Sequence, residues 1–235
     1  MIDAASLRAR LADVRARIAR AAGRAGRDPA AIRLIAVSKT FDADHVRIAA
    51  GEGQIDFGEN KVQEALLKMD RTSDLPIRWH LIGHLQSNKA RKAGARFHAV
   101  HSVDDAGLLR KLDEAAASAG RSIDLLVQVD LAGEATKFGA GEDELMPIFD
   151  AARTARSARI VGLMLLPPAV ANPDAARPYF RELVAVRGRL LARGVDDAMV
   201  HELSMGMSHD FEAAVEEGAT MVRVGTAIFG SRTYV

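Results

Sequence analysis

The sequence contains no cysteine and no apolar run of the roughly 20 residues that a membrane-spanning helix needs. Disulfides, thiolate metal ligands and a cysteine nucleophile are therefore excluded, and the absence is consistent with a reducing compartment. The net charge is only +1 at pH 7. A charge so close to balance gives no reason to expect nucleic acid or a membrane surface as a partner. We expect a cytoplasmic protein with neither partner.

The composition is otherwise ordinary for a globular protein. The chain has 235 residues, of which 49% are hydrophobic and 27% charged. No Ser- or Pro-rich linker divides it, so we expect a single domain over residues 1–235.

The first 28 residues are Arg-rich and amphipathic, a pattern also found in transit peptides. Asp3, Asp13 and the scarcity of serine argue against such a peptide. The pattern favours a structural helix that packs on the domain, because apolar residues recur at helical spacing. These residues are Leu7, Leu11, Val14 and Ile18.

Beyond this helix, strand-like and helix-like segments alternate. Strands are predicted at 32–38, 54–58, 77–83, 98–103, 123–130, 159–166, 199–205 and 220–229. Helices are predicted at about 42–51, 59–70, 87–94, 105–119, 142–155, 174–193 and 209–217. Continuously apolar strands indicate a parallel sheet that is covered on both faces. Eight such units most simply form an α/β fold of the TIM-type (β/α)8 barrel class, here with an extra N-terminal helix. An open doubly wound sheet is the alternative, although no GxGxxG follows the first strand.

The first strand ends in a lysine. In IRLIAVSKT (32–40), an apolar run leads into Ser38 and Lys39, and lysine is rarely buried. Burial at a barrel mouth would lower the pKa of Lys39, and a neutral amine can form a Schiff base with a carbonyl. Alternatively, Lys39 extends to solvent or pairs with a carboxylate such as Glu59. The strand alone does not decide between these alternatives.

The ends of the last two predicted strands suggest an anion site. SMGMSHD (204–210) offers the hydroxyls of Ser204 and Ser208 beside a helix start, and RVGT adds Gly225 and Thr226. Barrels frequently bind phosphate at the loops after strands seven and eight. The alternative is that Ser208 only caps a helix and Gly225 only allows close packing.

Other polar residues give weaker signals. His80 and His84 are four apart but lie in a strand and its loop, so they share no helical face for zinc, and we expect no metal site. His101 and His201 are expected to be hydrogen-bonded core histidines. Asp104 and Asp105 are expected to cap the helix that starts near 105.

Seven segments in order resemble the YggS/PROSC family of pyridoxal phosphate homeostasis proteins. They are AVSKT, FGENKVQEA, WHLIGHLQSNK, HSVDD, VDLAGEATKFG, GLMLLPP and LSMGMSHDFEAAVEEGATMVRVGTAIFG. The resemblance covers essentially the whole chain. That family is similar to the N-terminal barrel domain of alanine racemase and usually consists of a single-domain barrel.

The resemblance implies a cofactor and residue roles. Lys39 matches the lysine that holds pyridoxal 5′-phosphate (PLP) as an aldimine. Arg223 matches an arginine that faces the pyridine nitrogen, and Asn60 matches an asparagine near the cofactor. The positions that match phosphate-holding segments are Ser204, Met205, Gly225 and Thr226.

These implied roles favour a carrier over a catalyst. A guanidinium stays charged and should keep the ring nitrogen unprotonated, which makes the ring a weaker electron sink. A racemase also needs acid/base groups on both faces of its substrate, and the only tyrosines are Tyr179 and Tyr234. We expect a monomeric PLP carrier without strong catalysis, with PLP-dependent apo-enzymes as recipients. The alternatives are a slow amino-acid racemase, another PLP enzyme, or an aldolase-like barrel that uses Lys39 without a cofactor.

Overall fold

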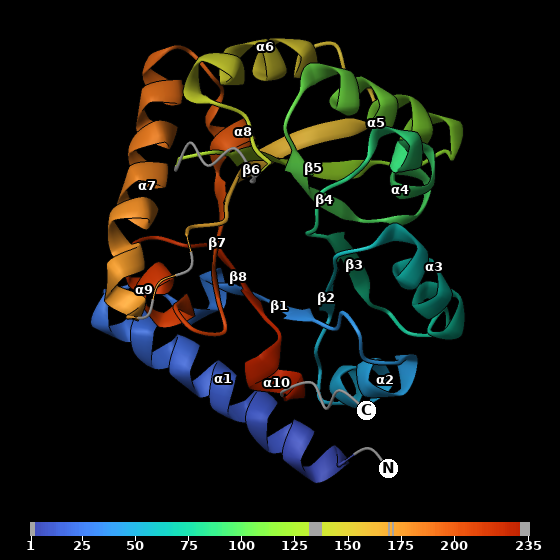
Figure 1. Cartoon of the computed structure of the whole chain (residues 1–235), viewed down its shortest axis with the longest axis vertical. Coiled ribbons are helices and arrows are strands. Elements are labelled where there is room, and N and C mark those ends of the chain that lie inside the picture. The colour runs from blue at the N-terminus through green and yellow to red at the C-terminus, as the bar shows by residue number, and fades with distance from the viewer. Residues whose placement is uncertain (1–2, 132–137, 169, 171, 231–235) are drawn as a thin grey trace.

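The computed structural model describes residues 3–131, 138–168, 170 and 172–230. Within that part, eight parallel strands close into a barrel in chain order (Figure 1). The strands are β1 (Arg33–Val37), β2 (Asp56–Glu59), β3 (Arg78–Leu81), β4 (Ala99–Val103), β5 (Ile123–Val129), β6 (Ala158–Leu165), β7 (Glu202–Met207) and β8 (Met221–Val224). The pairing of β1 with β8 closes the sheet, for example Ala36 opposite Val224. The predicted barrel is therefore confirmed, and the open sheet is excluded.

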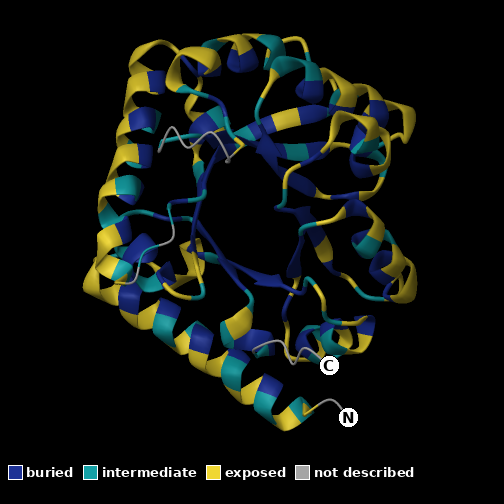
Figure 2. Cartoon of the chain, viewed as in Figure 1, coloured by how far each residue is buried: buried dark blue, intermediate teal, exposed yellow. Residues whose placement is uncertain are grey.

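Helices surround the barrel (Figure 1). The α-helices are α1 (Ala4–Arg24), α2 (Ala43–Gly51), α3 (Val62–Arg71), α4 (Ala90–Arg96), α5 (Ala106–Ser118), α6 (Glu142–Ala152), α7 (Arg177–Ala192), α8 (Asp197–Val200), α9 (Phe211–Glu216) and α10 (Thr226–Phe229). Short 3-10 turns are η1 (Pro29–Ala31), η2 (Ser87–Lys89) and η3 (Pro173–Ala176). Figure 2 shows the strands as mostly buried and the outer helix faces as exposed. Among the described helices, none is long and apolar enough to cross a membrane.

The N-terminal segment is a structural helix, as predicted. α1 begins after Asp3, whose side chain accepts a hydrogen bond from the Ser6 N–H. Its buried row is Leu7, Leu11, Val14, Ile18, Ala21 and Ala22. This row packs beside α2, α9 and α10. At the edge of the row, Arg17 forms a 2.8 Å ion pair with Glu212 of α9.

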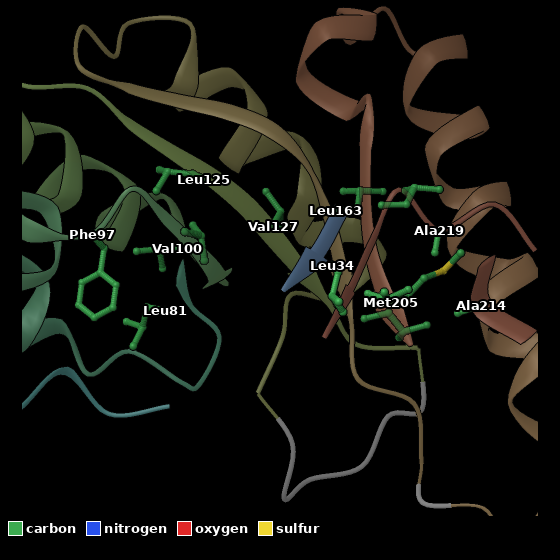
Figure 3. Packing of buried hydrophobic residues seen from close by; sticks show 14 of the residues in the cluster. Leu34, Leu81, Phe97, Val100, Leu125, Val127, Leu163, Met205, Ala214 and Ala219 are labelled. Carbon is green, nitrogen blue, oxygen red and sulfur yellow. The ribbon is translucent and has the colours of Figure 1, made fainter. Parts of the chain in front are cut away.

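Apolar residues fill both sides of the barrel wall. The larger cluster lies between strands and helices, and Figure 3 shows part of it, including Leu34, Leu125 and Leu163. A smaller cluster contains Ile35, Leu126, Met164 and Met221. Ile35 directly follows Leu34, and successive strand residues point to opposite faces, so this second cluster lies inside the barrel. Strand residues of both faces are buried, which explains the continuous apolar runs in the sequence.

Two predicted strands differ from the structure. The run 220–229 contains the short strand β8 and then the helix α10, because the chain leaves the strand at Gly225. The run 199–205 becomes a strand only at Glu202. The preceding turn is helical, and the Asp196 carboxylate caps it by accepting from the Ala198 N–H at 3.0 Å. Short apolar runs do not distinguish a strand from a buried helical turn.

Candidate functional site

Lys39 lies immediately beyond β1 at the carboxyl end of the barrel and is half-buried. The next residue, Thr40, has φ of 71°, in the left-handed region. A β-branched residue there is a genuine outlier that costs about 1–3 kcal/mol. Such strain clusters at functional sites, so the turn that follows Lys39 marks this strand end as a candidate site.

The peptide group before Lys39 is held by a buried polar cluster. The Ser38 hydroxyl donates to Glu59 Oε1 at 2.7 Å. Lys68 Nζ of α3 donates both to Glu59 Oε1 at 2.6 Å and to the Ser38 carbonyl at 2.7 Å. Burial raises the pKa of Glu59, although Lys68 and Ser38 act in the opposite direction. Glu59, one of the partners considered for Lys39, is thus bound by Lys68.

Asn60 follows β2 and is half-buried. The loop after β3 packs closely against the main chain of Asn60. A Cβ on Gly83 of this loop would lie only 2.4 Å from the Asn60 carbonyl oxygen. The Ser102 hydroxyl donates to the Gly83 carbonyl at 2.8 Å and holds that loop from β4. Asn60 is therefore fixed at the barrel mouth by its backbone.

Arg223 is buried inside the barrel. Its Nη1 donates to Ser204 Oγ at 2.6 Å, and its Nη2 donates to the Leu165 carbonyl at 2.8 Å. Burial lowers the pKa of Arg223 to about 10, which leaves the guanidinium charged at neutral pH. Ser204 also lies 2.9 Å from His101 Nδ1. The Ser204 hydroxyl is thus bound by two barrel residues, and its expected phosphate contact remains a prediction.

Ser208 is the serine beside Gly225. The sequence predicted for it only a helix cap or a hydroxyl at the anion site. Ser208 Oγ accepts from the Gly225 N–H at 3.0 Å and from the Ala227 N–H at 3.4 Å. Gly206, two residues before Ser208, has φ of 90° and packs closely against α9. A Cβ there would lie 2.5 Å from the Ala214 Cβ. The sequence signal for this contact was the second serine of SMGMS.

Of the two other residues predicted to hold the phosphate, Thr226 is exposed and Met205 is buried. Thr226 is exposed at the start of α10, directly after Gly225. Met205 is fully buried, and its side chain packs in the main core with Ala214 and Ala219 (Figure 3). Any contact between Met205 and a ligand would therefore be made by its main chain.

The strand ends bring Lys39 and the Gly225 segment together. A Cβ on Gly225 would lie 3.2 Å from the Val37 carbonyl oxygen, two residues before Lys39. Arg223 is two residues before Gly225 on β8, which pairs with β1. Since all these strands are parallel, Lys39, Asn60, Arg223 and Gly225 collect at one end of the barrel.

The histidines fall into two groups. His101 is a buried, hydrogen-bonded core residue, as predicted, and it lies 2.9 Å from His80. The prediction for His201 is wrong, because this residue is exposed in the turn between α8 and β7. His84 is exposed and stacks on the ring of Phe138. In the part of the chain that the structure describes, no group of three or more possible ligands could hold a metal ion.

Asp105 has its predicted role. Its carboxylate accepts from the Leu108 N–H at 2.8 Å and caps α5. The segment 132–137 of the VDLAGEATKFG motif, and Tyr234, lie outside the described residues.

Comparison with known proteins identifies the family. The protein-family model described as "Alanine racemase, N-terminal domain" matches residues 9–233 of this chain. The pyridoxal phosphate homeostasis protein of Pseudomonas aeruginosa is 44% identical over 224 residues, with 95% of each chain covered. The one from Aquifex aeolicus is 40% identical over 225 residues, covering 96% of this chain and 98% of its own. This chain belongs to the pyridoxal phosphate homeostasis protein family. The resemblance inferred from the seven motifs is thereby confirmed.

Solved structures of the same family agree with this assignment. PipY of Synechococcus elongatus PCC7942, a COG0325 family member solved with PLP bound, is 38% identical with a TM-score of 0.84. The match covers 95% of this chain and all of PipY. The alanine racemase of Clostridium difficile 630, at 16% identity and a TM-score of 0.70, shares the fold. The fold of this chain is thus also found in an enzyme.

Proposed function

We propose that this protein binds PLP at the carboxyl end of its barrel and acts in intracellular PLP homeostasis as a carrier. The observation that carries the proposal is the convergence, at one barrel end, of a lysine side chain, a buried guanidinium and backbone N–H groups that meet at one hydroxyl oxygen. Lys39, Arg223 and Gly225 supply these groups. The PLP-bound structure of PipY supports the same ligand.

The residues at the phosphate end are suited to an anion. Two backbone N–H groups, those of Gly225 and Ala227, already converge on one oxygen atom, the hydroxyl of Ser208. Convergent N–H groups of this kind form anion-binding concavities in proteins. Thr226, exposed between them, adds a hydroxyl. We propose that Gly225, Thr226 and Ser208 hold the phosphate, and that Ser204 and the main chain of Met205 lie behind them.

The reactive end depends on Lys39. When bound, PLP supplies an aldehyde carbon with which an amine forms a C=N bond. The Ser38–Glu59–Lys68 cluster holds the peptide group that precedes Lys39, so the lysine side chain starts from a fixed backbone. Arg223 can only donate hydrogen bonds and stays charged, so we propose that it faces the pyridine nitrogen and keeps it unprotonated. Asn60 is proposed to contact the ligand from the β2 loop.

The same features favour a carrier over a racemase. Tyr179 lies on α7, outside the barrel, where it packs on the main core. It is therefore not placed to serve as the acid/base group opposite Lys39. We propose that this protein limits free PLP and releases it to PLP-dependent apo-enzymes by exchange with another amine. A slow amino-acid racemase is the alternative.

Lys39→Ala tests the binding proposal. Purified protein mixed with PLP should develop a visible absorbance band that the variant lacks, because only an amine at this position forms the C=N bond. Lys92→Ala, which removes an exposed lysine of α4, is the matched control and should retain the band. An equal band in wild type and Lys39→Ala would overturn the role of Lys39.

The carrier and racemase proposals are separated by two measurements on PLP-loaded protein. Loaded protein should reactivate a PLP-dependent apo-enzyme while showing no alanine or serine racemisation near the ordinary enzymatic range of about 1 s⁻¹ or above. Turnover in that range would favour the enzyme.

A further inference from the structure

Five buried polar side chains form a continuous chain across the barrel interior. Asp56 Oδ1 lies 2.8 Å from His80 Nε2, and His80 Nδ1 lies 2.9 Å from His101 Nε2. The other ring nitrogen of His101, Nδ1, lies 2.9 Å from Ser204 Oγ. Ser204 Oγ in turn accepts a hydrogen bond from Arg223 Nη1 at 2.6 Å. The exposed fractions are Asp56 5%, His80 3%, His101 0%, Ser204 0% and Arg223 3%. The chain connects β2, β3, β4, β7 and β8.

The two ends of this chain fix the direction of every bond between them. Arg223 can only donate. Burial alone would raise the pKa of Asp56, but hydrogen bonds from His80 and Arg78 outweigh it and lower that pKa, so the carboxylate is ionised and only accepts. With both imidazoles neutral, each group between the ends accepts one hydrogen bond and donates the next.

The protons follow from this direction. Ser204, which accepts from Arg223, donates its O–H to His101 Nδ1. The Nε2–H of His101 donates to His80 Nδ1, and the Nε2–H of His80 donates to Asp56. Each neutral imidazole therefore carries its proton on Nε2, with every polar atom that faces the chain satisfied.

We infer that His80 and His101 are positioning residues for Arg223, forming a directed hydrogen-bond relay that presents Ser204 as an acceptor and ends on the carboxylate of Asp56. The inference rests on the proposed PLP site, in which Arg223 touches the ligand. Both hydrogen-bond acceptors of Arg223, Ser204 Oγ and the Leu165 carbonyl, are neutral. Burying a charge is costly. The Asp210 carboxylate favours the charged form of Arg223, and the polarised relay links the guanidinium to a second carboxylate, Asp56.

The surroundings of the two imidazoles are consistent with the neutral state. Burial places the pKa of His101 well below its ordinary 6.5, and electrostatic interactions with His80, Arg223 and Arg33 act in the same direction. The titratable or charged groups near the relay are Arg33 of β1, Asp56 of β2, Arg78 of β3, His98 before β4, Asp210 before α9 and Arg223 of β8.

Nitrogen-15 NMR of histidine-labelled protein without PLP tests the relay directly. At pH 7, the ring shifts of His80 and His101 should both show the neutral Nε2–H form, with assignments made from His80→Gln and His101→Gln. An Nδ1–H tautomer or an imidazolium at either residue would overturn the direction of the relay, whether or not the protein binds PLP.

A second experiment measures the effect on PLP binding. His101→Leu should weaken binding roughly tenfold, the loss expected when a buried hydrogen-bonding group loses its partner, and should shift the pH midpoint of the visible band. His101→Gln should restore both quantities toward wild type, because an amide offers an acceptor and a donor in the same 1,3 relation as the imidazole. His201→Gln, an exposed histidine, is the control.

Ser204→Ala interrupts the relay next to Arg223 and should reproduce the effects of His101→Leu, which keeps the test open if His101→Leu does not fold. Failure of wild type to form the band would reject the proposed function. A wild type that binds PLP, with Ser204→Ala matching it in affinity and pH midpoint, would reject the relay alone.

Discussion

At the scale of single residues, the backbone on both sides of Lys39 is constrained. The main-chain carbonyl of Ser38, before Lys39, accepts a hydrogen bond from the Lys68 ammonium. Thr40, directly after Lys39, has a strained φ angle. Both features constrain the main chain on either side of Lys39. The position of the lysine stem is thus determined by residues that have no direct part in binding.

Lys68→Met should destabilise the fold by about 3–5 kcal/mol, because it leaves Glu59 buried without its cation. Urea unfolding monitored by circular dichroism would measure the loss. The double variant Glu59→Gln with Lys68→Met should recover much of it, since no uncompensated charge then remains. A double variant as unstable as Lys68→Met would show that the ion pair is not the source of the effect.

The polar residues illustrate what sequence can predict at this scale. Lys39, Asn60, Arg223 and Gly225 could be assigned to strand ends because each follows a recognisable apolar run. The relay could not, because Asp56, His80, His101 and Ser204 meet only through the register of different strands. The pairing of Glu59 with Lys68 could not be predicted either, because Lys68 lies nine residues later on α3. The contact between Ser208 and Gly225 was also not predictable, because it joins the segments that follow two different strands.

At the scale of elements, the order and type of the strands followed from their apolar runs, whereas the short helices did not. β1 through β6 lie within a few residues of their predicted positions. α8 and α10 were predicted as parts of strands, because a four-residue helix is too short to show helical periodicity. These short helices shape the ends of β7 and β8, so the sequence was least informative near the proposed phosphate site.

Gly206→Ala should disturb the β7–α9 connection. The φ angle of 90° and the 2.5 Å approach to Ala214 both oppose a Cβ, so we expect a loss of about 1–3 kcal/mol and weaker PLP binding. Gly188→Ala in α7 is the matched control. It meets nothing within 4 Å and should stabilise the helix by about 0.5–1 kcal/mol. Thermal unfolding of both variants checks the sign of each change, and equal effects would contradict this account of Gly206.

At the scale of the whole molecule, the closed barrel holds titratable groups away from water. The pKa of His101 lies below its ordinary value in the folded protein, so the unfolded chain binds a proton that the folded state does not. The stability associated with neutral His101 is complete above pH 6.5 and is lost as the pH falls below that value.

The free energy of unfolding should therefore decline below pH 6.5, with His101 contributing up to about 1.4 kcal/mol per pH unit. Urea titrations from pH 7.5 down to about pH 5 would give the slope. His101→Gln should have a shallower slope, because its amide does not titrate. His98, whose pKa is also lowered by burial, contributes equally to both proteins. Identical slopes would mean that His101 is not the buried neutral group.

The pairing of β1 with β8 has a consequence for biosynthesis. Lys39 emerges early from the ribosome, whereas Arg223 and Gly225 are among the later residues to be synthesised. The proposed site joins both ends, so it cannot assemble on a nascent chain before its last strand has been released. Ligand capture would thus report that translation has passed β8, and fragments that stop short of this strand would bind PLP poorly even with Lys39 intact.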